Sequence, residues 1–97
     1  MEKVNKWRII LEKLRLVEYR GYYSIQIPVI MYDAIIGGIS SYWVNLIHDN
    51  CKKNVGNIFK EYCRDIYLAK DQLKVLEIHN KLRTNVCEGE ILEEFYY

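Results

Sequence analysis

The sequence predicts a mainly α protein, a small helical bundle of three to four helices that forms a single helical domain over residues 1–97. Three observations predict this fold class. Apolar residues recur at steps of three and four over residues 2–20 and again over residues 54–83. Residues 28–47 contain no Lys or Arg, as in a buried segment. The 97 residues, 51% hydrophobic and 28% charged, suit one globular core.

Residues 2–20 are expected to form an amphipathic helix that ends at Gly21. Two further apolar residues, Ile9 and Leu16, lie seven residues apart and off the main stripe. They are covered either by the rest of the domain or by a partner protein, and we include them among the candidate partner-binding residues. The main stripe consists of Val4, Trp7, Ile10, Leu11, Leu14 and Val17.

Residues 22–31 leave two interpretations open. Tyr23, Ile25 and Ile27 alternate with more polar residues, which is typical of a short strand. Pro28 lacks a backbone N–H and would restrict such a strand to the edge of a sheet. Alternatively, Pro28 occupies the first position of a helix, where proline is tolerated, and we favour this interpretation.

Residues 28–47 are expected to form a buried helix rather than a membrane span, because a central Asp33 costs about 2.5–3.5 kcal/mol on membrane insertion. Within this helix, Ala34, Gly37, Gly38 and Ser41 would form a patch of small residues that lets another helix approach closely.

Residues 54–83 carry the most regular helical pattern. Asn54 is the expected N-cap, and the segment forms either one long helix or two helices that break near Lys70 and Asp71. Since a helix this long exposes much apolar surface, we expect a homodimer through this seam, with Asn80 setting the register. The seam residues are Phe59, Tyr62, Ile66, Leu73, Leu76 and Asn80.

Residues 85–97 form an acidic aromatic C-terminal tail, whereas residues 50–83 carry eight basic and four acidic side chains. We expect the tail to fold back on the basic helix through Ile91, Leu92 and Phe95. The alternative is that it binds a basic pocket on another protein. The candidate binding residues are Glu93, Glu94, Phe95, Tyr96 and Tyr97.

Two other functions are weighed as alternatives. A small helical DNA-binding regulator would use a basic ridge along the long helix, formed by Lys60, Arg64, Lys70, Lys74 and Lys81. An enzyme or metal-binding protein would combine His48 or His79 with Cys51 or Cys63, although their spacing matches no zinc motif.

The composition indicates an origin rather than a mechanism. Ile, Tyr, Lys and Asn, whose codons are rich in A and T, make up 38 of 97 residues, as expected for a gene from an AT-rich genome such as that of a low-GC bacterium, its phage, a plasmid or an AT-rich virus. No signal peptide is evident, which favours the cytoplasm. The sequence therefore predicts a non-enzymatic protein-binding module, without metal or cofactor, that inhibits or redirects a host protein such as a defence factor.

Overall fold

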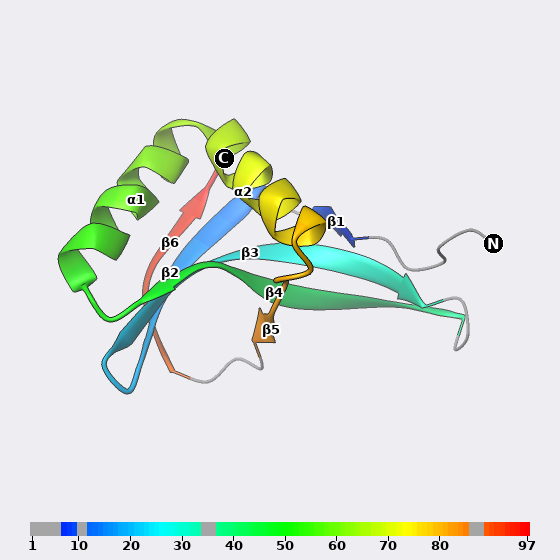
Figure 1. The fold of residues 1–97 in the computed structure, drawn as a ribbon, viewed down its shortest axis with the longest axis horizontal. Coiled ribbons are helices and arrows are strands. Elements are labelled where there is room, and N and C mark those ends of the chain that lie inside the picture. Colours follow the sequence, from blue (N-terminus) through cyan, green and yellow to red (C-terminus); the bar gives the residue numbers. More distant parts are fainter. Residues whose placement is uncertain (1–6, 10–11, 34–36, 86–88) are drawn as a thin grey trace.

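The computed structural model describes residues 7–9, 12–33, 37–85 and 89–97. These residues form one antiparallel sheet of six strands with two helices packed on one of its faces (Figure 1). The mainly α bundle of three to four helices predicted from the sequence is therefore wrong, and the domain is α+β. Neither of the two described helices has the length and apolar character needed to span a bilayer.

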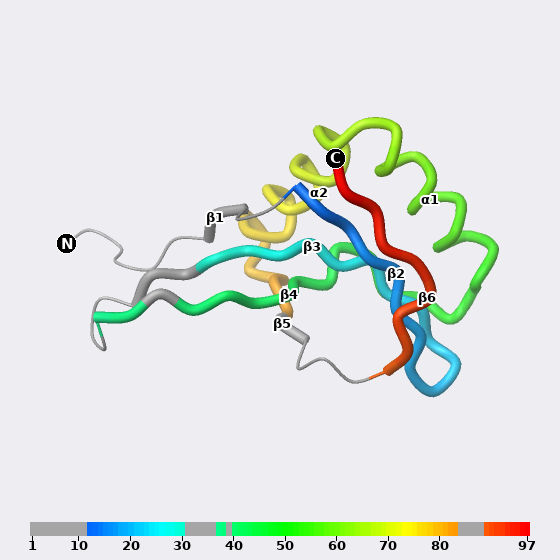
Figure 2. The backbone as a smooth tube through the Cα atoms, turned by 180° about the vertical axis from the view of Figure 1, so that it is seen from behind, coloured from blue at the N-terminus to red at the C-terminus, as the bar shows by residue number. Residues whose placement is uncertain are grey.

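The strand order places the first and last parts of the chain beside each other. Across the sheet the strands lie in the order β5, β4, β3, β2 and β6, and β1 pairs with β3 beyond the end of β2 (Figure 2). The elements are β1 (Trp7–Ile9), β2 (Lys13–Tyr19), β3 (Tyr22–Asp33), β4 (Gly38–Asp49), α1 (Lys52–Arg64), α2 (Ile66–Ile78), β5 (Thr84–Asn85) and β6 (Glu90–Tyr96).

In the described part of residues 2–20, strands β1 and β2 stand in place of the predicted helix, whereas residues 2–6, 10 and 11 lie outside the described residues. Leu14 and Leu16 face the helices, while Arg15 and Val17 are buried on the other face of the sheet. Because both faces of β2 are covered, its apolar residues do not follow a simple alternation and also fit steps of three and four. Because the same residues fit a helical pattern, the sequence predicted a helix for this segment.

The turn that follows β2 accounts for Gly21. Arg20 has a φ of 51° and Gly21 a φ of 82°, so both central residues are left-handed. Tyr19 pairs with Tyr22 directly across this two-residue loop. Two left-handed residues form the tight turn that matches the twist of a β-hairpin. Gly21 was expected to end a helix and instead joins β2 to β3.

Strands β3 and β4 form a long hairpin in place of the helix expected over residues 28–47. Their register runs from Tyr23 opposite Asp49 to Asp33 opposite Gly38, and Gly37 has a φ of 76° at the turn. β4 has buried residues toward the helices and half-buried Trp43 and Asn45 on its other face. The absence of Lys and Arg therefore reflects a strand covered on both faces.

Pro28 lies in a central strand and not at an edge, which corrects the edge-strand alternative. On one flank it pairs with Trp43 of β4. On the other flank, β2 pairs with β3 up to Gln26, and β1 pairs from Val29 onward. Pro28 falls between these two ladders, where a residue without an N–H is tolerated.

Residues 54–83 form two helices, and the break lies at Asp65 rather than near Lys70 and Asp71. The Asp65 carboxylate accepts a hydrogen bond from the Tyr67 N–H at 2.9 Å and caps the start of α2. The Asp65 N–H donates to the carbonyls of Glu61 and Tyr62 at the end of α1. One residue thus ends one helix and begins the next. α1 begins after Cys51, not after Asn54.

Asn80 ends α2 and does not belong to a buried seam. It is exposed and left-handed, with a φ of 54°. Its N–H donates to the Glu77 carbonyl at 3.1 Å, and the Lys81 N–H donates to the Leu76 carbonyl at 2.8 Å. These two bonds form a Schellman motif, in which Asn substitutes for the usual Gly.

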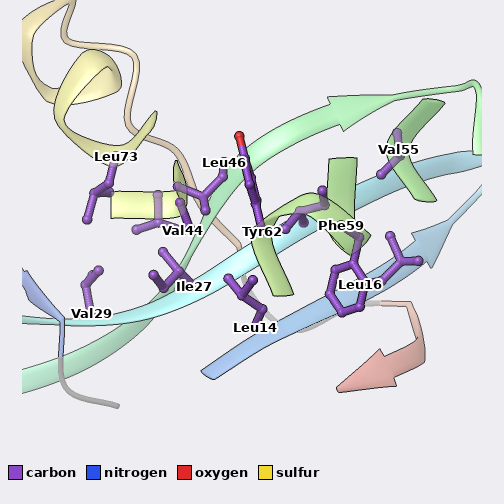
Figure 3. Packing of buried hydrophobic residues seen from close by; sticks show 12 residues of the cluster. Leu14, Leu16, Ile27, Val29, Val44, Leu46, Val55, Phe59, Tyr62 and Leu73 are labelled. Carbon is purple, nitrogen blue, oxygen red and sulfur yellow. The ribbon is translucent and has the colours of Figure 1, made fainter. Parts of the chain in front are cut away.

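The core lies between the helices and the face of the sheet that they cover. Phe59 and Tyr62 of α1 and Leu73 of α2, expected in a dimer seam, are buried against the chain's own sheet (Figure 3). Ile66 and Leu76 pack at the border of this core. The seam pattern is therefore accounted for by packing within one chain, and the expected homodimer stays a prediction.

Two glycines test the backbone conformations of this fold. A Cβ on Gly21 or on Gly56 would meet no atom within 4 Å, but only Gly21 is left-handed. We expect Gly21→Ala to destabilise the protein by about 1 kcal/mol. Gly56→Ala, inside α1, should stabilise it by about 0.5–1 kcal/mol. Urea unfolding monitored by circular dichroism measures both, and a destabilising Gly56→Ala would contradict the helix.

Candidate functional site

The acidic aromatic tail forms an edge strand. β6 pairs antiparallel with β2, with Leu14 opposite Phe95 and Lys13 opposite Tyr96. Among the described residues, no strand pairs with the outer edge of β6. Phe95 and Leu92 pack against the core of their own chain, whereas Ile91, the third residue expected to hold the tail, is 45% exposed. The partner of the tail is β2 as well as the helix.

The end of the chain is anchored beside α1. The Tyr97 N–H donates to the Glu12 carbonyl at 2.9 Å, and the Tyr97 hydroxyl donates to the Tyr62 carbonyl. The Tyr97 and Phe95 rings meet edge to face at 4.9 Å. Burial raises the pKa of the Tyr97 hydroxyl, which therefore stays protonated and remains a donor. These contacts fix β6 at a constant position relative to α1.

A groove lies between α1 and β6. In Figures 1 and 2, β6 runs between β2 and the helix, which is raised above the sheet. The groove has a volume of about 560 Å³, which is in the range of ligand-binding clefts. It is lined by Phe59, Lys60, Cys63 and Arg64 of α1 and by Glu93, Glu94 and Phe95 of β6.

The two walls of this groove carry opposite charges. Lys60 and Arg64 lie on the helix wall and Glu93 on the strand wall, and none of the three forms an ion pair with another described residue. Glu94 is engaged by Tyr96 at 2.9 Å and by Lys13 at 3.3 Å. The Tyr96 hydrogen bond and then Lys13 lower the pKa of the Glu94 carboxyl. The groove thus offers uncompensated charges of both signs.

Cys63 lies in the groove as a protonated thiol. Burial raises its pKa, and the negative charge of Glu93 raises it further. A nucleophilic cysteine requires the opposite shift, normally from a neighbouring cation or imidazolium. Cys63 therefore fits an apolar contact in this groove better than the nucleophile of a Cys-His pair.

The other residues considered for chemistry are dispersed. His48 contacts Ser24 through Nδ1 at 2.7 Å and stacks on Tyr22 at 5.1 Å, while His79 caps the end of α2. Cys51 precedes α1. Cys87 lies outside the described residues. In the described part of the chain, no three His, Cys, Asp or Glu side chains gather closely enough to hold a metal ion.

The basic ridge was expected along one long helix, but the helix breaks at Asp65 and the five cations are divided among α1, α2 and the segment after α2. Lys60 and Arg64 lie in the groove, and Lys70 pairs with Glu12 at 3.1 Å. Lys74 is exposed on α2, and Lys81 follows that helix. The five cations therefore do not form a continuous row for a nucleic-acid backbone.

The remaining predicted binding residues, Ile9 and Leu16, do not form an exposed row. Leu16 is only 6% exposed and belongs to the core under α1. The Ile9 backbone pairs with Val29 in β3. The side chain of Ile9 lies outside what the structure describes. The helix that placed the two residues side by side is absent.

A cation–aromatic cluster lies on the face of the sheet that has no helices, and the sequence did not predict it. The cluster comprises Lys13, Arg15, Trp43 and Tyr96. The Arg15 guanidinium lies 3.7 Å from the centre of the Trp43 ring, and Lys13 lies 4.6 Å from Tyr96 and 5.3 Å from Trp43. The alternation of Lys13 and Arg15 with two leucines is the signal that would have identified it, had the segment been treated as a strand.

A network of side-chain hydrogen bonds crosses the sheet from this cluster. Arg15 Nε donates to Gln26 Oε1 at 2.6 Å, and Gln26 Nε2 donates to Asn45 Oδ1 at 2.7 Å. Arg15 is 5% and Gln26 0% exposed. The cluster and this network cover the face of the sheet that has no helices.

The chain matches no family model, no curated protein and no solved structure. The function is therefore inferred from the arrangement of the described residues.

The raised pKa of Cys63 can be tested by alkylation with iodoacetamide. In a Cys51→Ser, Cys87→Ser background, the rate should reach half its maximum at a higher pH than for free cysteine, because only the thiolate reacts. Glu93→Gln should lower that midpoint and increase the rate at about pH 8, since the repelling carboxylate is lost. Glu77→Gln is the control and should have no effect. A midpoint below that of free cysteine would contradict this environment.

Proposed function

We propose that this protein is a binding module that takes an extended segment of another protein as an additional strand on β6, beside α1. The observation that carries the proposal is the open edge of β6 directly next to the groove. The outer N–H and C=O groups of an edge strand form a template for another strand. A peptide bound in this way gains affinity from main-chain hydrogen bonds and specificity from its side chains.

The groove would accept every second side chain of such a segment. An added strand lies about 4.8 Å from β6, and its side chains point alternately to the two faces of the sheet. Those on the helix side enter the groove over Phe59 and Phe95. Those on the opposite side lie next to Glu94 and Tyr96. The geometry therefore selects a segment with alternating residue types.

The charges of the site specify these types. On the helix side, Phe59 and Phe95 favour apolar side chains, while Lys60 and Arg64 on the helix wall favour acidic ones. On the opposite side, the Glu94 carboxylate and the Tyr96 ring favour basic side chains, through ion pairing and cation–π contact. We expect the bound segment to alternate apolar or acidic residues with Lys or Arg.

A second copy of β6 is a poor occupant of this edge. β6 carries Glu90, Glu93 and Glu94 and no basic residue. Antiparallel pairing of two such strands brings like charges opposite each other, which is destabilising. The charge of the strand thus favours a different protein over self-association. A host protein as partner is in keeping with the composition, which is typical of phages and other mobile elements.

Selection from a random peptide library displayed on phage tests the proposal. The enriched peptides should show the alternation of apolar or acidic with basic residues. Titrated into ¹⁵N-labelled protein, a selected peptide should shift the amide signals of β6 and of the facing turns of α1. Enrichment of no peptide, or shifts confined to other elements, would refute the proposal.

A charge reversal provides the matched control. Glu94→Lys should weaken a selected basic peptide by roughly two- to fivefold, the range expected for an exposed ion pair. Glu77→Lys makes the same change on the exposed face of α2 and should leave the affinity unchanged. Equal losses in both variants would mean that net charge, rather than the groove, determines binding.

A further inference from the structure

A second cavity lies at the other edge of the sheet, between β4 and the end of α2. Its volume is about 570 Å³. β4, the last turns of α2 and the segment that returns from α2 toward β5 surround it. The described lining residues are Asn45, Leu46, His48, Leu76, Asn80, Lys81, Leu82 and Arg83.

Backbone hydrogen bonds hold the walls of this cavity. The Schellman motif at Asn80 turns the chain back, and the Asn45 N–H then donates to the Arg83 carbonyl at 3.1 Å. Gln72 of α2 donates to the Leu46 carbonyl of β4 at 3.2 Å, where a bulge interrupts the pairing with β3. Hydrogen bonds of the backbone therefore define the walls of the cavity together with its side chains.

The lining of this cavity carries basic side chains and no described acidic one. Lys81 and Arg83 form no ion pair with another described residue, and no described carboxylate lines the cavity. The apolar part comes from Leu46, which is 3% exposed, and from Leu76 and Leu82, which border the core. Two cations beside an apolar surface match an organic anion with a hydrophobic body.

We propose that this cavity binds a small organic anion, whose phosphate or carboxylate is held by Lys81 and Arg83 and whose flat apolar body rests on the three leucines. The site lies at the sheet edge opposite β6 and shares no residue with the groove of the proposed function.

Titration of ¹⁵N-labelled protein tests the site. The probes are adenosine monophosphate and phenylacetate, which represent a phosphate and a carboxylate source, with inorganic phosphate and adenosine as the two incomplete ligands. At least one organic anion should shift the amide signals of Asn45, Asn80 and Arg83 saturably. Either incomplete ligand should bind at least about tenfold more weakly, because it lacks the apolar body or the charge.

Substitutions localise the effect. Lys81→Gln and Arg83→Gln, both at exposed positions, should each weaken the bound anion about tenfold. Lys74→Gln removes the same charge from an exposed position of α2 outside the cavity and should have no effect.

Three results would overturn the proposal. No saturable shift with either organic anion would exclude the site. Equal affinity for inorganic phosphate or for adenosine would exclude the combined recognition of charge and apolar body. Equal losses in Lys74→Gln and Arg83→Gln would indicate a general charge effect. Each result leaves the β6 groove untouched, so the two proposals fail independently.

Discussion

The structure depends on the burial of strand β2 on both of its faces. Toward the helices, Leu14 and Leu16 lie under α1, and removing each from water contributes about 1.5–3 kcal/mol. Toward the other face, Arg15 is buried against Trp43 with its charge paired to π-electrons and to Gln26. β2 also provides the backbone partner of both β3 and β6. The core, the cation–aromatic cluster and the β6 groove therefore share this strand.

The same double burial explains why the sequence predicted part of this fold and missed the rest. The helical pattern of residues 54–83 was visible in the sequence, because each helix packs one apolar face on the sheet. The heptad spacing did not reveal which surface covers that face. β2 and β4 are covered on both faces, and their patterns resembled buried helices. Some residues that line the groove were already named from the sequence, since Phe59 was a candidate seam residue and Glu93 and Phe95 were candidate binding residues. Their meeting depends on pairing between chain ends, which no local pattern encodes.

The near-neutral net charge conceals a polarity across the sheet. One edge strand, β6, carries three glutamates, and the opposite edge strand, β5, is preceded by Lys81 and Arg83. The sequence indicated this separation as a basic segment and an acidic tail. The structure assigns the two signs to the two ends of one sheet, about four strand spacings apart. Each edge thus presents a different surface to its surroundings.

The position of β6 in the strand order also determines how the molecule assembles. The β2, β3 and β4 strands are joined by short turns and can pair locally, whereas β6 must return from the far end of the chain to reach β2. Pairing between distant parts of the chain closes a long loop, which costs conformational entropy and slows folding. We therefore expect β6 to dock last and to detach first. While it is detached, β2 becomes the edge and exposes its outer N–H and C=O groups to other chains. The glutamates of the docked strand then have a second consequence, because they terminate the sheet with a charged edge that protects the protein from aggregation.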